Sequence, residues 1–227
     1  MSNTLAITLR SSVVKKQLVG ITGLLLCGFL VSHLLGNLLL FVGPEAFNKY
    51  GHALTSNPLI YIAEAGLLAL FLGHMGLAIK ATMENKSARP QQYYMKAKTG
   101  RGSTFASSTM PYTGVMLLAF IIFHLQGIKF GAVYEVTYDG QTMRDLYKLT
   151  FEKFSSLPYV GFYVISMFAM GVHVSHGFWS AFQSVGFWHS KYTPSLKKTA
   201  TAYALFVGIG FSVLPIYCFP EQRFVIL

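Results

Sequence analysis

Charged side chains are scarce in this sequence, and acidic ones are the scarcest. The 227 residues include 18 Lys and Arg but only 8 Asp and Glu, and charged residues make up 11% of the chain against 53% hydrophobic residues. A soluble domain carries about 25% charged residues. The chain therefore has little room for a soluble domain, and its composition is that of a basic integral membrane protein.

Cysteine motifs are absent as well. The two cysteines, Cys27 and Cys218, both fall within apolar stretches. There is no Cys-x-x-Cys-His sequence, which excludes covalent attachment of a c-type haem, and no Cys/His spacing typical of zinc. We interpret both cysteines as small core residues, because a free cysteine packs as a small hydrophobe.

What the sequence does contain is five long apolar stretches. About 20 apolar residues cross a bilayer as a helix, the form in which backbone groups satisfy one another. We predict an all-α integral membrane bundle, a single domain over residues 1–227, with five transmembrane helices at about 18–42, 58–80, 107–130, 158–187 and 199–219. The first stretch is too long for a cleavable signal, so we expect it to remain in the protein. The segment 131–157 is polar and amphipathic, with a turn signal at 138–140.

The basic residues concentrate on one side of this arrangement. The N-terminal tail and the loops 80–106 and 188–198 carry one acid, Glu84, and twelve basic residues: Arg10, Lys15, Lys16, Lys80, Lys86, Arg89, Lys96, Lys98, Arg101, Lys191, Lys197 and Lys198. Nearly all of the +10 net charge therefore lies on one side. The positive-inside rule places that side, and with it the N-terminus, in the cytoplasm. Contact with anionic lipids explains such a face, and docking of a soluble partner is the other interpretation.

Histidine occupies an unusual set of positions. Four of the five predicted helices carry one, and the fourth helix has a second: His33, His74, His124, His173 and His176. Imidazole rings are uncommon inside membrane helices, because each polar ring needs a partner that hydrocarbon cannot supply. One such ring is as readily a hydrogen-bonded core side chain as a ligand. One on each of four helices indicates a set of axial ligands.

Depth sorts these histidines into two pairs. At about 1.5 Å per residue, His74 lies roughly 9 Å from the cytoplasmic end of its helix, and His124 and His33 lie about 8 Å and 14 Å from the outer ends of theirs. A b-type haem with two imidazole ligands takes one from each of two facing helices. We predict an outer haem held by His33 and His124 and an inner haem held by His74 and His173. Depth alone slightly favours His176 over His173.

The order of the motifs resembles that of a known family. The carriers are Thr22-Gly23 and Ser32-His33-Leu34 in the first helix, Glu45 to Lys49 after it, then Gly73-His74, Phe123-His124 and His173-Val-Ser-His-Gly-Phe-Trp179 on the next three helices. Together they are similar to the single-chain, di-haem membrane anchors of succinate dehydrogenases and fumarate reductases, the five-helix type B subunits. The resemblance covers nearly the whole chain.

The resemblance implies a cytochrome b that binds two haem b groups and a quinone, for which we expect menaquinone. Such a subunit sits in the bacterial cytoplasmic (inner) membrane and passes electrons between the quinone and an iron–sulfur subunit on the cytoplasmic face. That subunit serves a flavoprotein, where succinate and fumarate interconvert in the respiratory chain and the tricarboxylic acid cycle. The chain itself would hold no catalytic residue for succinate. The resemblance leaves open a dimer of heterotrimers.

The resemblance also ranks individual residues. It prefers His173 as the ligand on the fourth helix and makes His176 a neighbour of the haem. Some fumarate reductases carry a glutamate two residues before this ligand, where this chain has Gly171, so their proton route is not expected here. The quinone candidates lie toward the outer side: Glu64, His52, Glu45 and Asn48. A carboxyl inside a membrane helix indicates function, although a protonated Glu64 bonded to a neighbouring helix is the alternative.

Two other functions fit part of the pattern. The cytochrome b anchor of a hydrogenase or a formate dehydrogenase has a similar number of helices, but it places its histidines differently. A non-haem transporter could use the histidines and Glu64 as a path for protons or metal ions. An absorption spectrum that lacks the band of a b-type haem would exclude both cytochromes.

Overall fold

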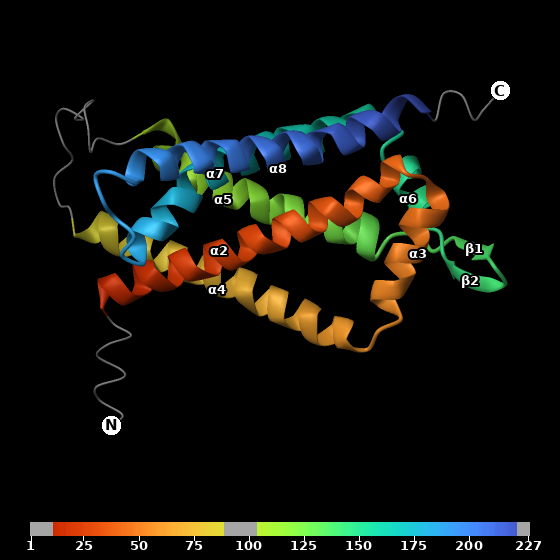
Figure 1. Cartoon of the computed structure of the whole chain (residues 1–227), viewed down its shortest axis with the longest axis horizontal. Coiled ribbons are helices and arrows are strands. Elements are labelled where there is room, and N and C mark those ends of the chain that lie inside the picture. Colours follow the sequence, from red (N-terminus) through yellow and green to blue (C-terminus); the bar gives the residue numbers. More distant parts are fainter. Residues whose placement is uncertain (1–10, 89–103, 222–227) are drawn as a thin grey trace. The chain divides into compact units, whose positions relative to one another are not determined.

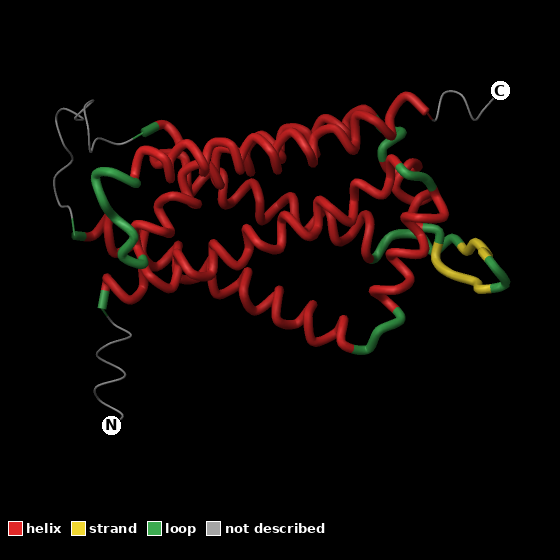
Figure 2. Tube along the Cα trace, in the orientation of Figure 1, coloured by secondary structure: helices red, strands yellow, loops and turns green. Residues whose placement is uncertain are grey.

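Five long helices make up most of the protein in the computed structural model, which describes residues 11–88 and 104–221 (Figures 1 and 2). They are α2 (Ser12–Asn37), α4 (Leu59–Ser87), α5 (Phe105–His124), α7 (Leu157–Ser184) and α8 (Thr193–Glu221). A 3-10 turn, η1 (Leu38–Phe41), extends α2, and a π-turn, η2 (Leu125–Lys129), extends α5. All five are long and apolar enough to cross a membrane. The predicted five-helix membrane fold is confirmed, and the cytoplasmic N-terminus stays a prediction.

Three of these helices extend beyond the predicted apolar stretches by six or seven residues, and one of them is α8, which begins at Thr193 where the prediction began it at residue 199. The prediction began the first helix at residue 18 and ended the second at residue 80, whereas α2 begins at Ser12 and α4 ends at Ser87. In α2 and α4 these extensions carry an ion pair between Lys15 and Glu84, in which the lysine is buried. The predicted stretches end where the first charged residues lower the hydropathy. Helices α2 and α4 continue past these points, where the charges of Lys15 and Glu84 satisfy one another.

Contacts divide the chain into two compact units, and each unit takes a part of all five long helices. Unit 1 comprises residues 1–28, 66–114 and 172–204, and unit 2 comprises residues 29–65, 115–171 and 205–227. Each helix therefore passes from one unit into the other along its own length. The predicted single domain over residues 1–227 stays a prediction.

Small residues bring the helices of unit 1 close together. A Cβ at Gly20 of α2 would lie 3.1 Å from the carbonyl oxygen of Ala181 on α7, so only glycine fits there without a shift. The hydroxyl of Tyr203 on α8 donates to the carbonyl oxygen of Cys27 on α2 at 2.6 Å. Cys27 is a buried free cysteine, and so is Cys218 in unit 2, which confirms their prediction as core residues.

Unit 2 contains a buried apolar core and three short elements that the sequence did not resolve. Its core joins α2, α6, α7 and α8 through buried residues: Leu34, Leu40, Phe151, Phe154, Val160, Tyr163, Leu214 and Cys218. The short elements are α3 (Pro44–Thr55), the hairpin β1 (Glu135–Tyr138) and β2 (Gln141–Arg144), and α6 (Leu146–Lys153), which lie side by side in Figure 1. We call these three elements the cap. The predicted turn at 138–140 connects the two strands.

The cap is tied together by Asn48 and Arg144. Asn48 of α3 is fully buried, where its Nδ2 donates to the carboxylate of Asp145 and its Oδ1 accepts from the backbone N–H of Tyr147, both at 2.9 Å. The guanidinium of Arg144 donates at 3.0–3.2 Å to four backbone carbonyls that follow α5: Ile128, Lys129, Gly131 and Ala132. These bonds satisfy polar groups that a membrane helix leaves exposed where it ends.

Replacing Asn48 should destabilise the protein. Asn48→Ala removes the acceptor of the Tyr147 backbone N–H and one of the two donors to Asp145 Oδ1, and a buried polar group that loses its partner costs about 1–3 kcal/mol. We expect a lower midpoint of thermal unfolding, measured by circular dichroism in detergent. The matched control is Asn57→Ala, because Asn57 is exposed and water can replace its bond to the Leu59 N–H. Equal midpoints for the two variants would contradict the role of Asn48.

Candidate functional site

In unit 1, His74 of α4 and His173 of α7 lie near enough to one another for an electrostatic interaction between their rings. The Nδ1 of His74 is 3.0 Å from the Oγ1 of Thr22 on α2, and the Nδ1 of His173 is 3.0 Å from the Oγ1 of Thr113 on α5. Four helices of unit 1 therefore contribute to this group of side chains. Two are ligand candidates and two are hydroxyls that hold them.

The threonines determine which nitrogen of each ring carries the hydrogen. The hydroxyl of Thr22 donates to the carbonyl oxygen of Leu18 at 2.7 Å, and that of Thr113 donates to the carbonyl oxygen of Thr109 at 3.1 Å. Each hydroxyl has one hydrogen and has used it, so its oxygen can only accept from the histidine. The hydrogen of each imidazole is therefore on Nδ1, and the lone pair on Nε2 is free to bind a metal.

Glycines leave room beside these two rings. A Cβ at Gly23 would lie 3.1 Å from the Cε1 of His74, and a Cβ at Gly114 would lie 3.7 Å from the Cε1 of His173. A residue larger than glycine at position 23 would therefore fit only if the His74 ring moved. The Thr22-Gly23 pair of the sequence acts as one unit, in which the threonine binds the ring and the glycine leaves it space.

His176, one turn after His173, has different surroundings. Its ring makes an edge contact with Trp179, with 5.3 Å between ring centres. Within the part of the chain that the structure describes, no hydrogen bond holds either of its ring nitrogens. The side chain of Lys197 lies close enough for its charge to act on this histidine, and the same ammonium lies 4.6 Å from the ring centre of Trp179.

In unit 2, His33 of α2 and His124 of α5 face one another. Their ring centres are 5.9 Å apart, and their planes meet at 85°. Two metal–nitrogen bonds of about 2 Å each, on either side of one ion, would hold two imidazole centres roughly 6 Å apart. The separation of these two rings therefore fits the pair of ligands that a bis-histidine haem requires.

Aromatic rings and polar groups hold this second pair in place. Phe29 stacks on His33 with 5.2 Å between ring centres, and Phe120 stacks on His124 at 5.6 Å. The Nδ1 of His124 is 3.2 Å from the hydroxyl of Tyr163 on α7. The Nδ2 of Asn37 is 3.5 Å from the Nδ1 of His33 and donates to the carbonyl oxygen of that residue at 2.7 Å. His33 is therefore held mainly by packing, whereas His124 has a hydrogen-bond partner.

Three of the four predicted quinone residues lie on α3, in the cap of unit 2. Glu45 forms an ion pair with Lys49, His52 lies 2.9 Å from the side chain of Gln141, and Asn48 is the buried structural residue described above. Lys49 also pairs with Asp139 at 2.6 Å. Its hydrogen bonds to Asp139 and Glu45 raise the pKa of Lys49, and the same ammonium lowers the pKa of Asp139. The cap is thus a network of paired charges.

The fourth predicted quinone residue, Glu64 of α4, is not part of the cap. It pairs with Lys129, the last residue of the π-turn after α5, and both side chains are 40% exposed. This carboxylate is therefore partnered by a cation within unit 2. The partner that the structure gives Glu64 is thus an ammonium on the turn that extends the neighbouring helix α5.

Thr113, Tyr163 and Asn37 were not singled out from the sequence, whereas Thr22 was named only as part of a family motif. Asn37 could have been, because it lies one turn after His33 on the same helix face. Thr113 and Tyr163 could not, since they are 60 and 39 residues away from the rings that they contact. Only the packing of one helix against another identifies such partners.

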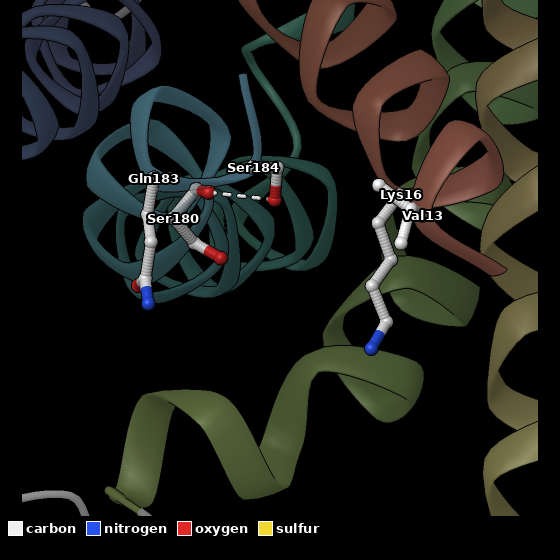
Figure 3. Close-up of a pocket in the computed structure, with 5 residues that line it drawn as sticks. All are labelled: Val13, Lys16, Ser180, Gln183 and Ser184. Atoms are coloured by element: carbon white, nitrogen blue, oxygen red, sulfur yellow. Dashed lines mark hydrogen bonds between the residues drawn. The ribbon is translucent and has the colours of Figure 1, made fainter. Parts of the chain in front are cut away.

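A pocket of about 380 Å³ in unit 1 lies apart from these rings. It is lined by Val13 and Lys16 of α2 and by Ser180, Gln183 and Ser184 of α7. Figure 3 shows Lys16 on one side of the space and Ser180 and Gln183 on the other, with Ser184 bonded back to its own helix. None of the five histidine candidates lines it, so this pocket is not the candidate ligand site.

One protein of similar sequence has a name that bears on these sites. The succinate dehydrogenase cytochrome b558 subunit of Bacillus subtilis (strain 168) is 26% identical over 187 residues, which cover 81% of this chain and 83% of that protein. The resemblance to a succinate dehydrogenase cytochrome b subunit is confirmed. The match covers most of both chains, so it is a likeness to a whole cytochrome b subunit. No family model matches the chain, and no solved structure matches it.

Proposed function

We propose that this chain is the di-haem cytochrome b membrane anchor of a succinate dehydrogenase or fumarate reductase in the bacterial cytoplasmic membrane. The observation that carries the proposal is the pairing of the four helix histidines, one pair within each unit. The likeness to the Bacillus subtilis subunit supports it independently. The anchor of a hydrogenase or formate dehydrogenase would not account for that likeness.

His33 and His124 would hold one haem and His74 and His173 the other. A haem with two imidazole ligands supplies a one-electron carrier whose iron has no open position for a substrate. The protein's own part is to hold His74, His173 and His124 by Nδ1, which leaves Nε2 for the iron, and to hold His33 mainly by packing. Partners of this kind orient a ligand and raise its basicity, and their loss typically costs 10- to 100-fold in metal affinity.

The surroundings of His173 and His176 favour His173 as the ligand. His173 has the same kind of partner as His74, a threonine whose hydroxyl hydrogen is already donated within its own helix. His176 lies against Trp179 and near Lys197. A lysine beside a ring suits contact with an anionic group, such as a haem propionate, better than it suits metal ligation.

The charge of unit 1 supports docking of a soluble partner. Its described part carries one acid, Glu84, which is paired with Lys15, and six further lysines: Lys16, Lys80, Lys86, Lys191, Lys197 and Lys198. Arg10, Arg89, Lys96, Lys98 and Arg101 of the predicted basic face lie outside the described residues. By the positive-inside rule this end faces the cytoplasm, where the iron–sulfur subunit would bind it and carry the flavoprotein subunit.

The quinone would react on the outer side of the membrane, next to residues of unit 2. Glu64 and Lys129 place an acid and its partner there, and both are exposed enough to reach a ligand. Moving one electron across the membrane corresponds to about 2.3 kcal/mol per 100 mV. Electrons that leave an inside-negative cytoplasm run with this potential, which helps succinate reduce a low-potential quinone such as menaquinone.

The purified complex should show two b-type haems for each copy of this chain. We expect an α-band of b-type haem in the reduced-minus-oxidised absorption spectrum and a pyridine haemochrome ratio of two. His33→Ala and His74→Ala should each remove one haem, because they act on different pairs. A spectrum without the band would reject the proposal and favour the hypothesis of a non-haem transporter.

The choice on α7 can be tested with a pair of neighbouring variants. His173→Ala should lose one haem, whereas His176→Ala should keep both, since only His173 shares the arrangement of His74. Haem per protein in the purified complex is the measurement. Loss of one haem in His176→Ala together with full retention in His173→Ala would reverse the assignment.

The quinone role of Glu64 predicts a specific loss of activity. Glu64→Gln removes the proton-accepting carboxylate, so turnover with menaquinone should fall by about 100-fold or more, the usual effect of losing a general acid or base. Electron transfer from succinate to a soluble dye should stay unchanged, because it does not pass through this chain. The matched control is Glu135→Gln, which removes an exposed carboxylate of unit 2 that is not a quinone candidate. Equal quinone turnover in the two variants would count against Glu64.

A further inference from the structure

Two tyrosines of α7 form a chain of hydroxyls that begins at His124. The hydroxyl of Tyr163 is 3.2 Å from the Nδ1 of His124 and 3.1 Å from the hydroxyl of Tyr159, one turn earlier on α7. We propose that Tyr163 and Tyr159 are positioning residues for the outer haem, which determine the orientation and the electron donation of His124. This inference rests on the proposed haem function and adds residues that the ligand set does not contain.

The surroundings of Tyr163 limit what its hydroxyl can do. Its side chain is 6% exposed, and Phe120 and Phe154 both pack on its ring edge to face with 4.9 Å between ring centres. The ring therefore has one orientation, and its hydroxyl reaches His124 on one side and Tyr159 on the other. A buried hydroxyl that lost these partners would be costly to keep.

The direction of the hydrogen bonds follows from the ligand role of His124. If Nε2 binds iron, the hydrogen of the ring is on Nδ1, so the oxygen of Tyr163 accepts it. The hydroxyl hydrogen of Tyr163 is then free to be donated to the oxygen of Tyr159. Hydrogen bonds in such a chain strengthen one another, so Tyr159 makes Tyr163 a better acceptor for His124.

The chain of hydroxyls ends against the π-turn that follows His124. The N–H of Phe130 donates to the carbonyl oxygen of Leu125 at 2.9 Å, five residues earlier, which is the bond that defines this turn. A Cβ at Gly127 within the turn would overlap the hydroxyl of Tyr159. The glycine therefore seats Tyr159, and π-turns of this kind are frequent at functional sites. Arg144 fixes the turn from its other side through the carbonyl oxygens of Ile128 and Lys129.

The two units thus hold their ligands differently. In unit 1 the partner of His173 is Thr113, whose hydroxyl ends on its own helix. In unit 2 the partner of His124 is a tyrosine that depends on a second tyrosine and on a glycine. A substitution at Gly127, which contacts neither haem ligand, should therefore change the properties of the outer haem alone.

The test is a redox titration of both haems in the purified complex, with electron paramagnetic resonance of the ferric state. Tyr163→Phe keeps the packed ring and removes the acceptor, so it should raise the midpoint potential of one haem and shift its g values. Tyr159→Phe and Gly127→Ala should move the same haem in the same direction by a smaller amount. Thr113→Val should move the other haem, which identifies the two signals.

The matched control is Tyr61→Phe, because Tyr61 is a tyrosine of unit 2 that is 71% exposed. It should leave both potentials unchanged. Two haems in the wild type, with Tyr163→Phe shifting neither or both, would overturn the inference and leave the proposed function standing. A shift in Tyr163→Phe without any in Tyr159→Phe and Gly127→Ala would also overturn it. A wild-type complex without haem would refute the proposed function and this inference together.

Discussion

A polar ring inside hydrocarbon needs a partner for each of its two nitrogens, and the rest of this structure follows from that requirement. Three of the four helix histidines have a hydroxyl at Nδ1: Thr22 for His74, Thr113 for His173 and Tyr163 for His124. With one nitrogen bonded to the protein, the other remains in each case for a metal. His176 shows the contrast, since no hydrogen bond to its ring is found among the described residues. On α7 this requirement therefore separates His173 from His176, which depth does not.

The same requirement explains how the helices end. Backbone groups at the end of a membrane helix lack partners within that helix, and they must find them elsewhere. Arg144 supplies them for the carbonyl oxygens after α5, and Asn48 ties the cap that holds Arg144 in place. At the start of α2 and the end of α4, the pair of Lys15 and Glu84 lets both helices continue past the apolar stretch. Charge near the membrane boundary thus supports structure as well as orientation.

The sequence predicted correctly those features that depend on a single segment of the chain. Five apolar stretches predicted five helices, because length and hydropathy are properties of a single segment. The two buried cysteines were predicted for the same reason. The cap was not resolved into α3, the hairpin and α6, since its short elements are held by pairs such as Asn48 and Asp145 that lie 97 residues apart. Thr113 and Tyr163 were missed because a hydroxyl on one helix shows no sign of the ring that it meets on another.

The division into two units bears on how a mutation can spread. His74, His173, Thr22 and Thr113 all belong to unit 1, whereas His33, His124, Tyr159 and Tyr163 all belong to unit 2. Each pair of ligands has its partners in its own unit, so the contacts that set one pair contain no residue of the other. The units are still joined through the long helices, and α7 carries both Tyr163 and His173 within ten residues. A change in the pitch or position of α7 would alter both pairs of ligands, whereas the loss of one hydroxyl would alter only one pair. Effects that stay within one haem therefore indicate side-chain contacts, and effects on both indicate that the helix itself has moved.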